Sequence, residues 1–339
     1  MAEDEEAIKS PQFKDRKGGL VFFGIIHLLL GGLCVLMTLV MILGVIVSTS
    51  VENATSSPME FWMMTPAILL YVLLAVWFIW MGVGSIKARR WARALVLISS
   101  WFWLISGVTG IIFMLVFMPD MYAKMGESGQ VPQNVVSAMK IVMSSIMVVF
   151  LFVIPGVFVL FYGSKNVKAT CEFRDSNIRW TDKCPLPVLG LTLLLSYSAL
   201  FAFWGSFGCY KGIPFFGIII SGNLGTVMYL SISILLGFLA RGVYHLKLKS
   251  FWGSVALFLL GGISTFVTSY NVNIFEFYKC MDISPQSMEL MKTLDLPSNF
   301  HMALYSGLWF AVIVGYILYT KKYFTDLPAQ NMLTGEIDQ

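Results

Sequence analysis

The chain has 339 residues, of which 57% are hydrophobic and only 12% are charged, with a formal net charge of +4. Soluble domains are about half apolar and about a quarter charged, so this composition excludes an ordinary water-soluble enzyme. The small positive charge does not indicate a nucleic-acid partner, because in a membrane protein the positions of Lys and Arg relative to the bilayer carry the information.

The first predicted element is a cytoplasmic tail, residues 1–18, which is acidic and then basic. A cleaved secretory signal needs a basic start and a short apolar core. The apolar run that follows the tail, residues 19–48, is far longer than such a core. We therefore expect a retained first membrane span.

Apolar runs bounded by polar turns recur along the whole chain. A helix that crosses about 30 Å of hydrocarbon needs about 20 apolar residues, and eight runs meet this condition. The sequence therefore predicts an all-α, polytopic helical membrane protein. The predicted spans are residues 20–47, 62–86, 94–118, 141–162, 186–207, 214–239, 251–270 and 301–319.

The distribution of basic residues predicts the orientation of these spans. If the N-terminus is cytoplasmic, 18 Lys and Arg residues fall in inner segments and 5 in outer segments, which together account for all 23. Inner loops of membrane proteins carry such an excess. We therefore expect both termini, including the tail of residues 321–339, in the cytoplasm.

The two halves of the chain resemble each other. YVLLAVWFIWMGVGSIKARRW from Tyr71 and YLSISILLGFLARGVYHLKLKSFW from Tyr229 share a Tyr-led apolar run, a Gly, a basic turn and a Trp that opens the next span. Four spans are an even number, so both copies would enter the bilayer in the same direction. This pattern predicts a tandem parallel 4+4 repeat, with four-helix units at residues 19–162 and 186–320. The alternative is that membrane helix pairs generally look alike.

The sixth predicted span contains a polar and flexible stretch, Ser221, Asn223 and Gly225 among its residues. When Tyr71 is set against Tyr229, Pro66 of the second span falls opposite this stretch. Paired helix breaks at matching positions are typical of transporter sites, so these four residues are candidates for substrate binding. The alternative is that the glycines allow close helix packing and that Pro66 lies harmlessly near a helix start.

The polar segment between the halves, residues 163–185, is predicted as a cytoplasmic linker loop. It carries Arg174, Asp175, Trp180, Asp182 and Lys183, which could dock a cytoplasmic or membrane protein partner. The alternative is a solvated loop without a partner.

Two stretches carry a resemblance to a known group. VKATCEFRDSNIRWTDKCPLPVL from Val167 and SIKARRWARALVLISSWFWL from Ser85 resemble an uncharacterised group of bacterial polytopic membrane proteins. The resemblance implies a bacterial inner membrane. It implies no activity, because the group has none assigned.

Cysteine and histidine residues give weaker indications. Cys171 and Cys184 lie in the polar segment and are expected to be free thiols in a reducing cytosol. Cys209 and Cys280 fall on the outer side and could form a disulfide.

His27 is the one titratable side chain expected inside a span, and it lacks nearby partners for a metal or haem site. A neutral His27, hydrogen-bonded to a neighbouring helix, is the simpler interpretation.

The sequence offers no nucleotide-binding, hydrolase or metalloprotease motif in a suitable context. Carboxylates are also missing from span centres, which argues against a proton-driven pump. We therefore predict a non-enzymatic scaffold or accessory subunit without cofactor or metal, whose partners are the lipid bilayer and a protein. A passive transporter or channel is the alternative. An intramembrane enzyme that acts on lipid would need His27 and a span serine at one depth.

Overall fold

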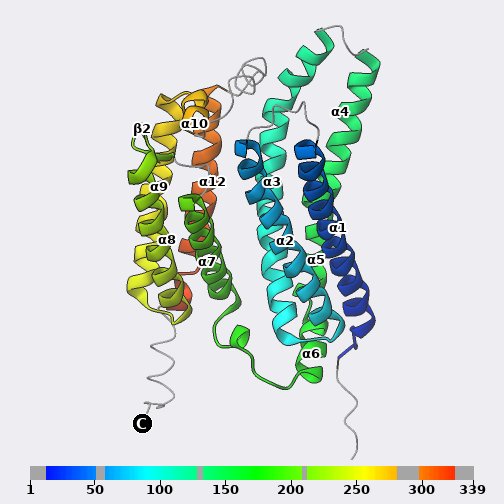
Figure 1. The fold of residues 1–339 in the computed structure, drawn as a ribbon. Helices are drawn as coiled ribbons and strands as arrows, with labels where there is room; N and C mark the ends of the chain where they lie inside the picture. The colour runs from blue at the N-terminus through cyan, green and yellow to red at the C-terminus, as the bar shows by residue number, and fades with distance from the viewer. Residues whose placement is uncertain (1–12, 51–57, 128–132, 208–211, 281–297, 325–339) are drawn as a thin grey trace, which may run out of the picture. The chain divides into compact units, whose positions relative to one another are not determined.

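The computed structural model describes residues 13–50, 58–127, 133–207, 212–280 and 298–324, and Figure 1 shows its elements in chain order. The helices are α1 (Lys17–Ser50), α2 (Pro58–Ile86), α3 (Arg90–Glu127), α4 (Gln133–Val148), α5 (Ile154–Gly163), α6 (Lys165–Arg174), α7 (Leu186–Phe207), α8 (Gly222–Tyr244), α9 (Leu248–Asn271), α10 (Ile274–Cys280) and α12 (Asn299–Tyr319). The other elements are a π turn, η1 (Val149–Val153), a 3-10 turn, η2 (Trp180–Asp182), and a hairpin of β1 (Ile213–Phe215) and β2 (Ile218–Ile220).

Eight helical stretches within these residues are long and apolar enough to cross a membrane. The fourth stretch combines α4, η1 and α5. The prediction of an all-α polytopic fold is confirmed, and the chain is a multi-pass membrane protein. The stretches are Lys17–Val47, Ala67–Ile86, Arg90–Ile112, Ser137–Gly163, Leu186–Ser206, Gly222–Tyr244, Leu248–Asn271 and Asn299–Phe324.

The chain folds as two compact units. The first unit comprises Met1–Ser106 and Val149–Lys183, and the second comprises Gly107–Val148 and Cys184–Gln339. The predicted four-helix units, residues 19–162 and 186–320, rest on sequence order rather than on contacts and stay a prediction.

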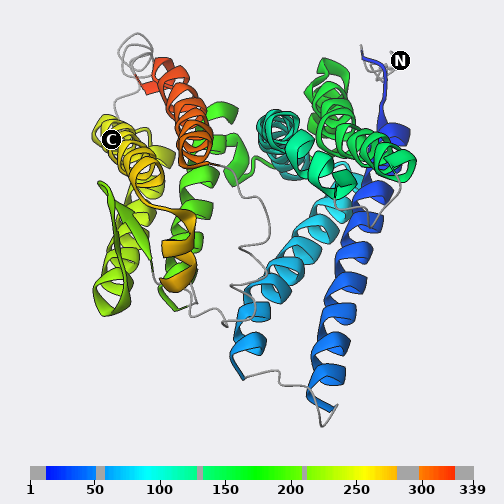
Figure 2. The same cartoon turned by 90° about the horizontal axis from the view of Figure 1, so that it is seen from above.

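In the first unit, α1 packs against α2 along a seam with heptad spacing. Figures 1 and 2 show the two helices side by side. A Cβ added to Gly24 would lie 3.0 Å from the backbone oxygen of Gly82, so the helix backbones approach closely, as small residues allow in membranes. The opposite stripe of α1 is exposed and suits lipid contact. The buried positions of α1 are Leu20, Gly24, His27, Gly31, Thr38 and Val45, and the exposed stripe includes Phe22, Leu29, Leu36 and Leu43.

The fourth membrane-spanning stretch changes its winding at η1. Pro155 has no backbone N–H and cannot continue the α-helical bonding, so the helix widens into a π turn just before it. Beyond this turn, Tyr162 is fully buried in the first unit. Its hydroxyl lies 2.6 Å from the Ser85 hydroxyl, which donates to the Leu20 carbonyl at 2.9 Å. These bonds join α5, α2 and α1.

In the second unit, α7, α8, α9 and α12 enclose one apolar core. Leu191, Leu239, Phe251 and Ile317 contribute from the four helices. Phe324, just after α12, packs on Phe251 with ring centroids 5.0 Å apart. Burial of several large side chains of this kind is the expected basis of helix association in this unit.

The start of the sixth predicted span is wrong. Residues 213–220 form the β1–β2 hairpin, with Ile213 paired to Ile220, and α8 begins only at Gly222. Phe216 and Gly217 have φ of 43° and 96°, the two successive positive values of a type I′ turn. Their N–H groups donate to Ser264 Oγ and Thr268 Oγ1 of α9, each at 3.0 Å. This apolar run can therefore form a hairpin instead of a helix, because hydroxyl groups of α9 accept hydrogen bonds from its backbone N–H groups.

The α2–α3 and α8–α9 connections have the same geometry. Ala88 follows α2 with a φ of 51°, and Leu246 follows α8 with a φ of 56°. Each residue lies in a Schellman-type turn. Arg89 N–H donates to Gly84 O in the first turn and Lys247 N–H donates to Gly242 O in the second, both at 2.9 Å. The shift that aligns Tyr71 with Tyr229 also aligns these turns. This agreement supports the predicted repeat, which stays a prediction.

Candidate functional site: a polar element held by a buried carboxylate

The polar segment that was predicted as a loop begins as a helix. Ser164 caps α6: it has extended backbone angles and its Oγ accepts the Val167 N–H at 3.4 Å, as N-cap serines do. Asp175 follows the helix, and its N–H donates to Cys171 O at 2.9 Å. The turn η2 completes a structured segment, residues 165–183, which we name the α6–η2 element.

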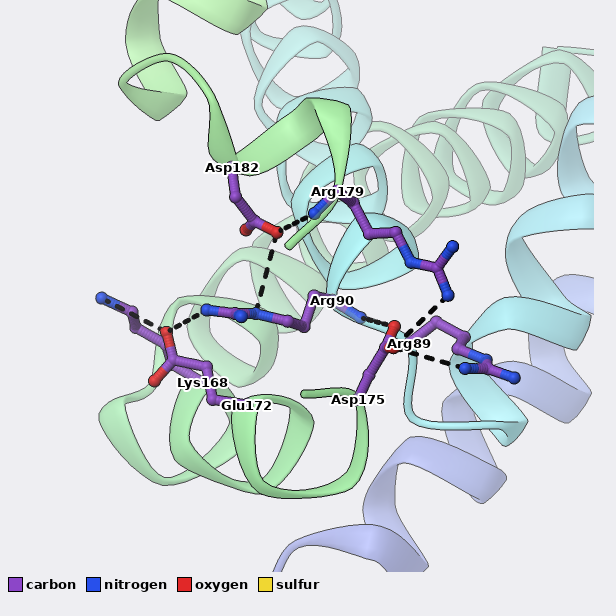
Figure 3. A network of polar contacts seen from close by, with 7 residues as sticks. All are labelled: Arg89, Arg90, Lys168, Glu172, Asp175, Arg179 and Asp182. Carbon is purple, nitrogen blue, oxygen red and sulfur yellow. Dashed lines mark hydrogen bonds and ion pairs between the residues drawn. The ribbon is translucent and has the colours of Figure 1, made fainter. Parts of the chain in front are cut away.

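Asp175 is the buried centre of the contacts made by this element, since its side chain is only 1% exposed. One carboxylate oxygen accepts from the Arg89 guanidinium at 3.3 Å and from the Arg179 guanidinium at 3.4 Å. The other oxygen accepts the backbone N–H of Arg90 at 3.3 Å, at the N-terminus of α3, where a negative charge is favourable. Figure 3 shows these groups converging. Asp175 thereby ties α6 to the α2–α3 turn.

Arg90 makes a second link through its side chain. Its guanidinium lies 3.4 Å from Glu172 on α6 and 3.7 Å from Asp182 in η2. Lys168 lies 3.8 Å from the same Glu172, as Figure 3 also shows. Partly exposed pairs of this kind are individually weak, but a network fixes the relative positions of its members.

The turn η2 is closed locally by Asp182. Its carboxylate accepts the Arg179 N–H at 2.9 Å, and the Lys183 N–H donates to Trp180 O at 3.3 Å. The Lys183 side chain is exposed. Among the described residues, Arg179 Nε and Thr181 Oγ1 are buried without a hydrogen-bond partner.

The segment that leads into α1 is attached to the same element. The Arg174 guanidinium lies 2.6 Å from the Asp15 carboxylate, and this hydrogen bond holds the pKa of Asp15 below its usual value. The Arg16 N–H donates to Thr170 Oγ1 at 3.1 Å. The α6–η2 element therefore contacts the start of α1 as well as the α2–α3 turn.

Cys171 and Cys184 are free and buried. Burial penalises the thiolate and raises the pKa of each thiol to about 11. A catalytic or redox-active thiol needs a low pKa and access to solvent, so these two cysteines are poor nucleophiles.

Three large apolar side chains of the α6–η2 element are exposed to a large extent. Phe173 is 68% exposed, Ile178 is 75% exposed and Trp180 is 42% exposed. None of them lies in a membrane-spanning stretch. Exposed apolar groups on a structured polar element are typical of an interaction surface.

Of the predicted site residues, the structure brings Arg174, Asp175, Trp180, Asp182 and Lys183 into the α6–η2 element. Arg89 and Arg90, which contact Asp175 and Asp182, were not among the predicted site residues, because their charges had served only to orient the spans. An acidic segment beside a loop with two adjacent arginines was the available signal.

The four candidate substrate-binding residues lie at the start of α8 and within α2. Ser221 precedes α8, while Asn223 and Gly225 lie in its first turn. Pro66 lies within α2. A polar stretch at a helix start needs no unwinding, and the substrate site predicted from these four residues stays a prediction.

His27 packs inside the first unit. Its side chain is 2% exposed, its Nδ1 lies 2.8 Å from Phe23 O, and its ring stacks on Phe158 with centroids 4.8 Å apart. Nδ1–H therefore donates to its own helix, not to a neighbouring helix. The possible disulfide of Cys209 and Cys280 lies outside the residues whose side chains the structure describes.

The described residues thus define a multi-pass membrane protein with a structured polar element beside its spans. Among these residues, no group of three or more His, Cys, Asp and Glu side chains could hold a metal ion. Comparison of the chain with known protein families, curated proteins and solved structures gives no match.

Proposed function

We propose that the chain is a non-enzymatic scaffold or accessory subunit of the bacterial inner membrane, and that its α6–η2 element binds a partner protein on the cytoplasmic side. The orientation follows from the inner excess of Lys and Arg. The compartment follows from the resemblance to bacterial membrane proteins.

The exposure of Ile178 carries this proposal. A side chain that is 75% exposed on a segment outside the spans loses favourable burial of about 1.5–3 kcal/mol. The buried Asp175 and its arginines keep that segment in one shape, which a plain linker would not need. A fixed segment with a strongly exposed apolar side chain suits a protein partner.

A lipid surface suits the element less well. Interfacial segments direct free Lys and Arg towards anionic headgroups. Of the five basic residues of the element, Lys168, Arg174 and Arg179 are instead paired with Glu172, Asp15 and Asp175. Most basic side chains of the element therefore support its own fold rather than attachment to the bilayer.

A photo-crosslinking amino acid at position 178 tests the proposal in intact cells. The expected result is a discrete protein adduct, together with loss of the same partner from mild-detergent preparations of Ile178→Ser. The matched control is position 160, because Leu160 is 77% exposed but lies in a span; it should give no such adduct. Adducts with lipid alone at position 178, or an undiminished partner in Ile178→Ser, would contradict the proposal.

A further inference from the structure

A groove runs between α7 and α8 within the second unit. Its volume is about 720 Å³ and its lining is mostly apolar. It exists because the facing positions carry small residues, which hold the two helices together while leaving space beside their contact. These small residues are Ser196, Ala199, Ser233, Gly237 and Ala240.

The hydroxyl groups of the groove are already satisfied by backbone carbonyls. Thr192 donates to Val188 O at 3.0 Å, and Ser196 donates to Thr192 O at 2.8 Å. Ser233 donates across the pair to Ala199 O at 2.8 Å. An occupant therefore meets a surface without free donors along most of the groove, which suits a hydrocarbon chain.

The space in the groove is open at Gly237. A Cβ added there would meet no atom within 4 Å. Gly lowers helix stability by about 1 kcal/mol relative to Ala, so a glycine without a packing contact at mid-helix has no stabilising role of its own. It does keep the groove wide.

A single cationic group marks one end of the groove. Arg241 lies in the last turn of α8 and is exposed. Among the described residues its guanidinium makes no hydrogen bond or ion pair. The opposite end, at Phe203, lies about 16 Å along α7 from Thr192, at a rise of about 1.5 Å per residue. Arginine near the end of a span extends towards the headgroups.

We propose that this groove binds an anionic phospholipid, with an acyl chain between α7 and α8 and the phosphate on Arg241. A guanidinium matches phosphate oxygens in a two-pronged geometry. The bilayer supplies such a ligand at high local concentration. The groove shares no residue with the α6–η2 element, and the proposal does not depend on the partner of that element.

The test uses the full-length protein in bilayers of phosphatidylcholine mixed with phosphatidylglycerol, followed by mild detergent extraction and native mass spectrometry. Wild-type protein should retain phosphatidylglycerol in preference to phosphatidylcholine. Arg241→Gln should lower that retention about tenfold, because a hydrogen bond to a charged group is worth about that factor. Gly237→Leu should remove the retained lipid while raising the unfolding temperature.

Gly315→Leu is the matched control, because a Cβ at Gly315 of α12 also meets no atom within 4 Å; it should retain phosphatidylglycerol like the wild type. Equal retention of both lipids by wild-type protein would overturn the proposal, as would undiminished phosphatidylglycerol in Gly237→Leu. A lower unfolding temperature of Gly237→Leu would show that side chains of the protein itself occupy the groove, which would also overturn the proposal. Preferential retention of an added free fatty acid would assign the groove to another amphiphile.

Discussion

The carboxylate of Asp175 accepts the backbone N–H of Arg90 at 3.3 Å, so a side chain beyond α6 caps the helix that starts the third membrane-spanning stretch. Helix N-termini leave backbone N–H groups unsatisfied, and a carboxylate there is favourable both as an acceptor and as a charge. The bond connects two segments that are far apart in the sequence.

Asp175→Asn should lower the free energy of unfolding by about 2 kcal/mol, because the neutral amide leaves Arg89 and Arg179 without their shared charge. Thermal unfolding of the detergent-solubilised protein measures this loss. Glu276→Gln is the control, since Glu276 forms an exposed pair with Lys279 and should change stability by less than about 1 kcal/mol. Equal effects of the two substitutions would refute a structural role for Asp175.

The two helix turns allow a paired test of their likeness. Gly242→Ala should be destabilising by about 1–3 kcal/mol, because the new Cβ would lie 2.6 Å from the Cβ of Ser250. Gly84→Ala should act similarly, because its Cβ would lie 2.6 Å from the Cβ of Ala92. The shift that aligns the turns pairs Gly84 with Gly242 and Ala92 with Ser250.

Double-mutant cycles then separate the two sites. Ser250→Gly should rescue Gly242→Ala almost fully, whereas Ala92→Gly should rescue Gly84→Ala only in part, because Trp91 also lies 2.6 Å from the added Cβ. Unfolding temperatures of the single and double variants measure the coupling. Additive effects in both cycles would mean that these contacts do not limit helix approach.

Ser264 and Thr268 should stabilise the β1–β2 hairpin on α9. Alanine at either position leaves a hairpin N–H without its partner, which we expect to lower the free energy of unfolding by about 1–3 kcal/mol. Thr265→Ala is the control, because the Thr265 hydroxyl donates to Gly261 O of its own helix. Thermal unfolding of the three variants measures these changes in stability. A loss of stability in Thr265→Ala as large as in the other two variants would contradict the prediction.

Stability should fall at high pH because of Cys171 and Cys184. Their pKa is raised from 9.0 to about 11 by burial, so the unfolded chain loses these protons first as the pH rises. Each thiol should lower the free energy of unfolding by about 1.4 kcal/mol per pH unit between pH 9 and 11 and have no effect below that window. Comparison of wild-type protein with Cys171→Ala isolates the effect of one thiol. Identical slopes of unfolding free energy against pH in the two proteins would contradict the prediction.

The spans were predictable because crossing a bilayer demands long apolar runs, and length and hydropathy are directly visible in a sequence. The hairpin at residues 213–220 was not, because its apolar residues fit either a helix or a strand. The hairpin is favoured by the hydroxyl groups of Ser264 and Thr268 on α9, which lie about 50 residues further along the chain.

The polar element was located from its charges, but its helix and its buried centre were not. Asp175 could be recognised as one charge among several. Its burial depends on Arg89 and Arg90, which belong to a turn between two spans and which the positive-inside pattern already explained. A single residue can serve both orientation and packing, and sequence pattern alone does not separate the two roles.

The α2–α3 and α8–α9 turns also bear on how the protein forms in the cell. Each turn closes through bonds within six consecutive residues, Gly84–Arg89 and Gly242–Lys247, and local contacts form fastest. Each helix pair can therefore assume its final shape as soon as its second helix leaves the ribosome and enters the bilayer. Synthesis would then deliver prefolded hairpins, and only their assembly would wait for the rest of the chain.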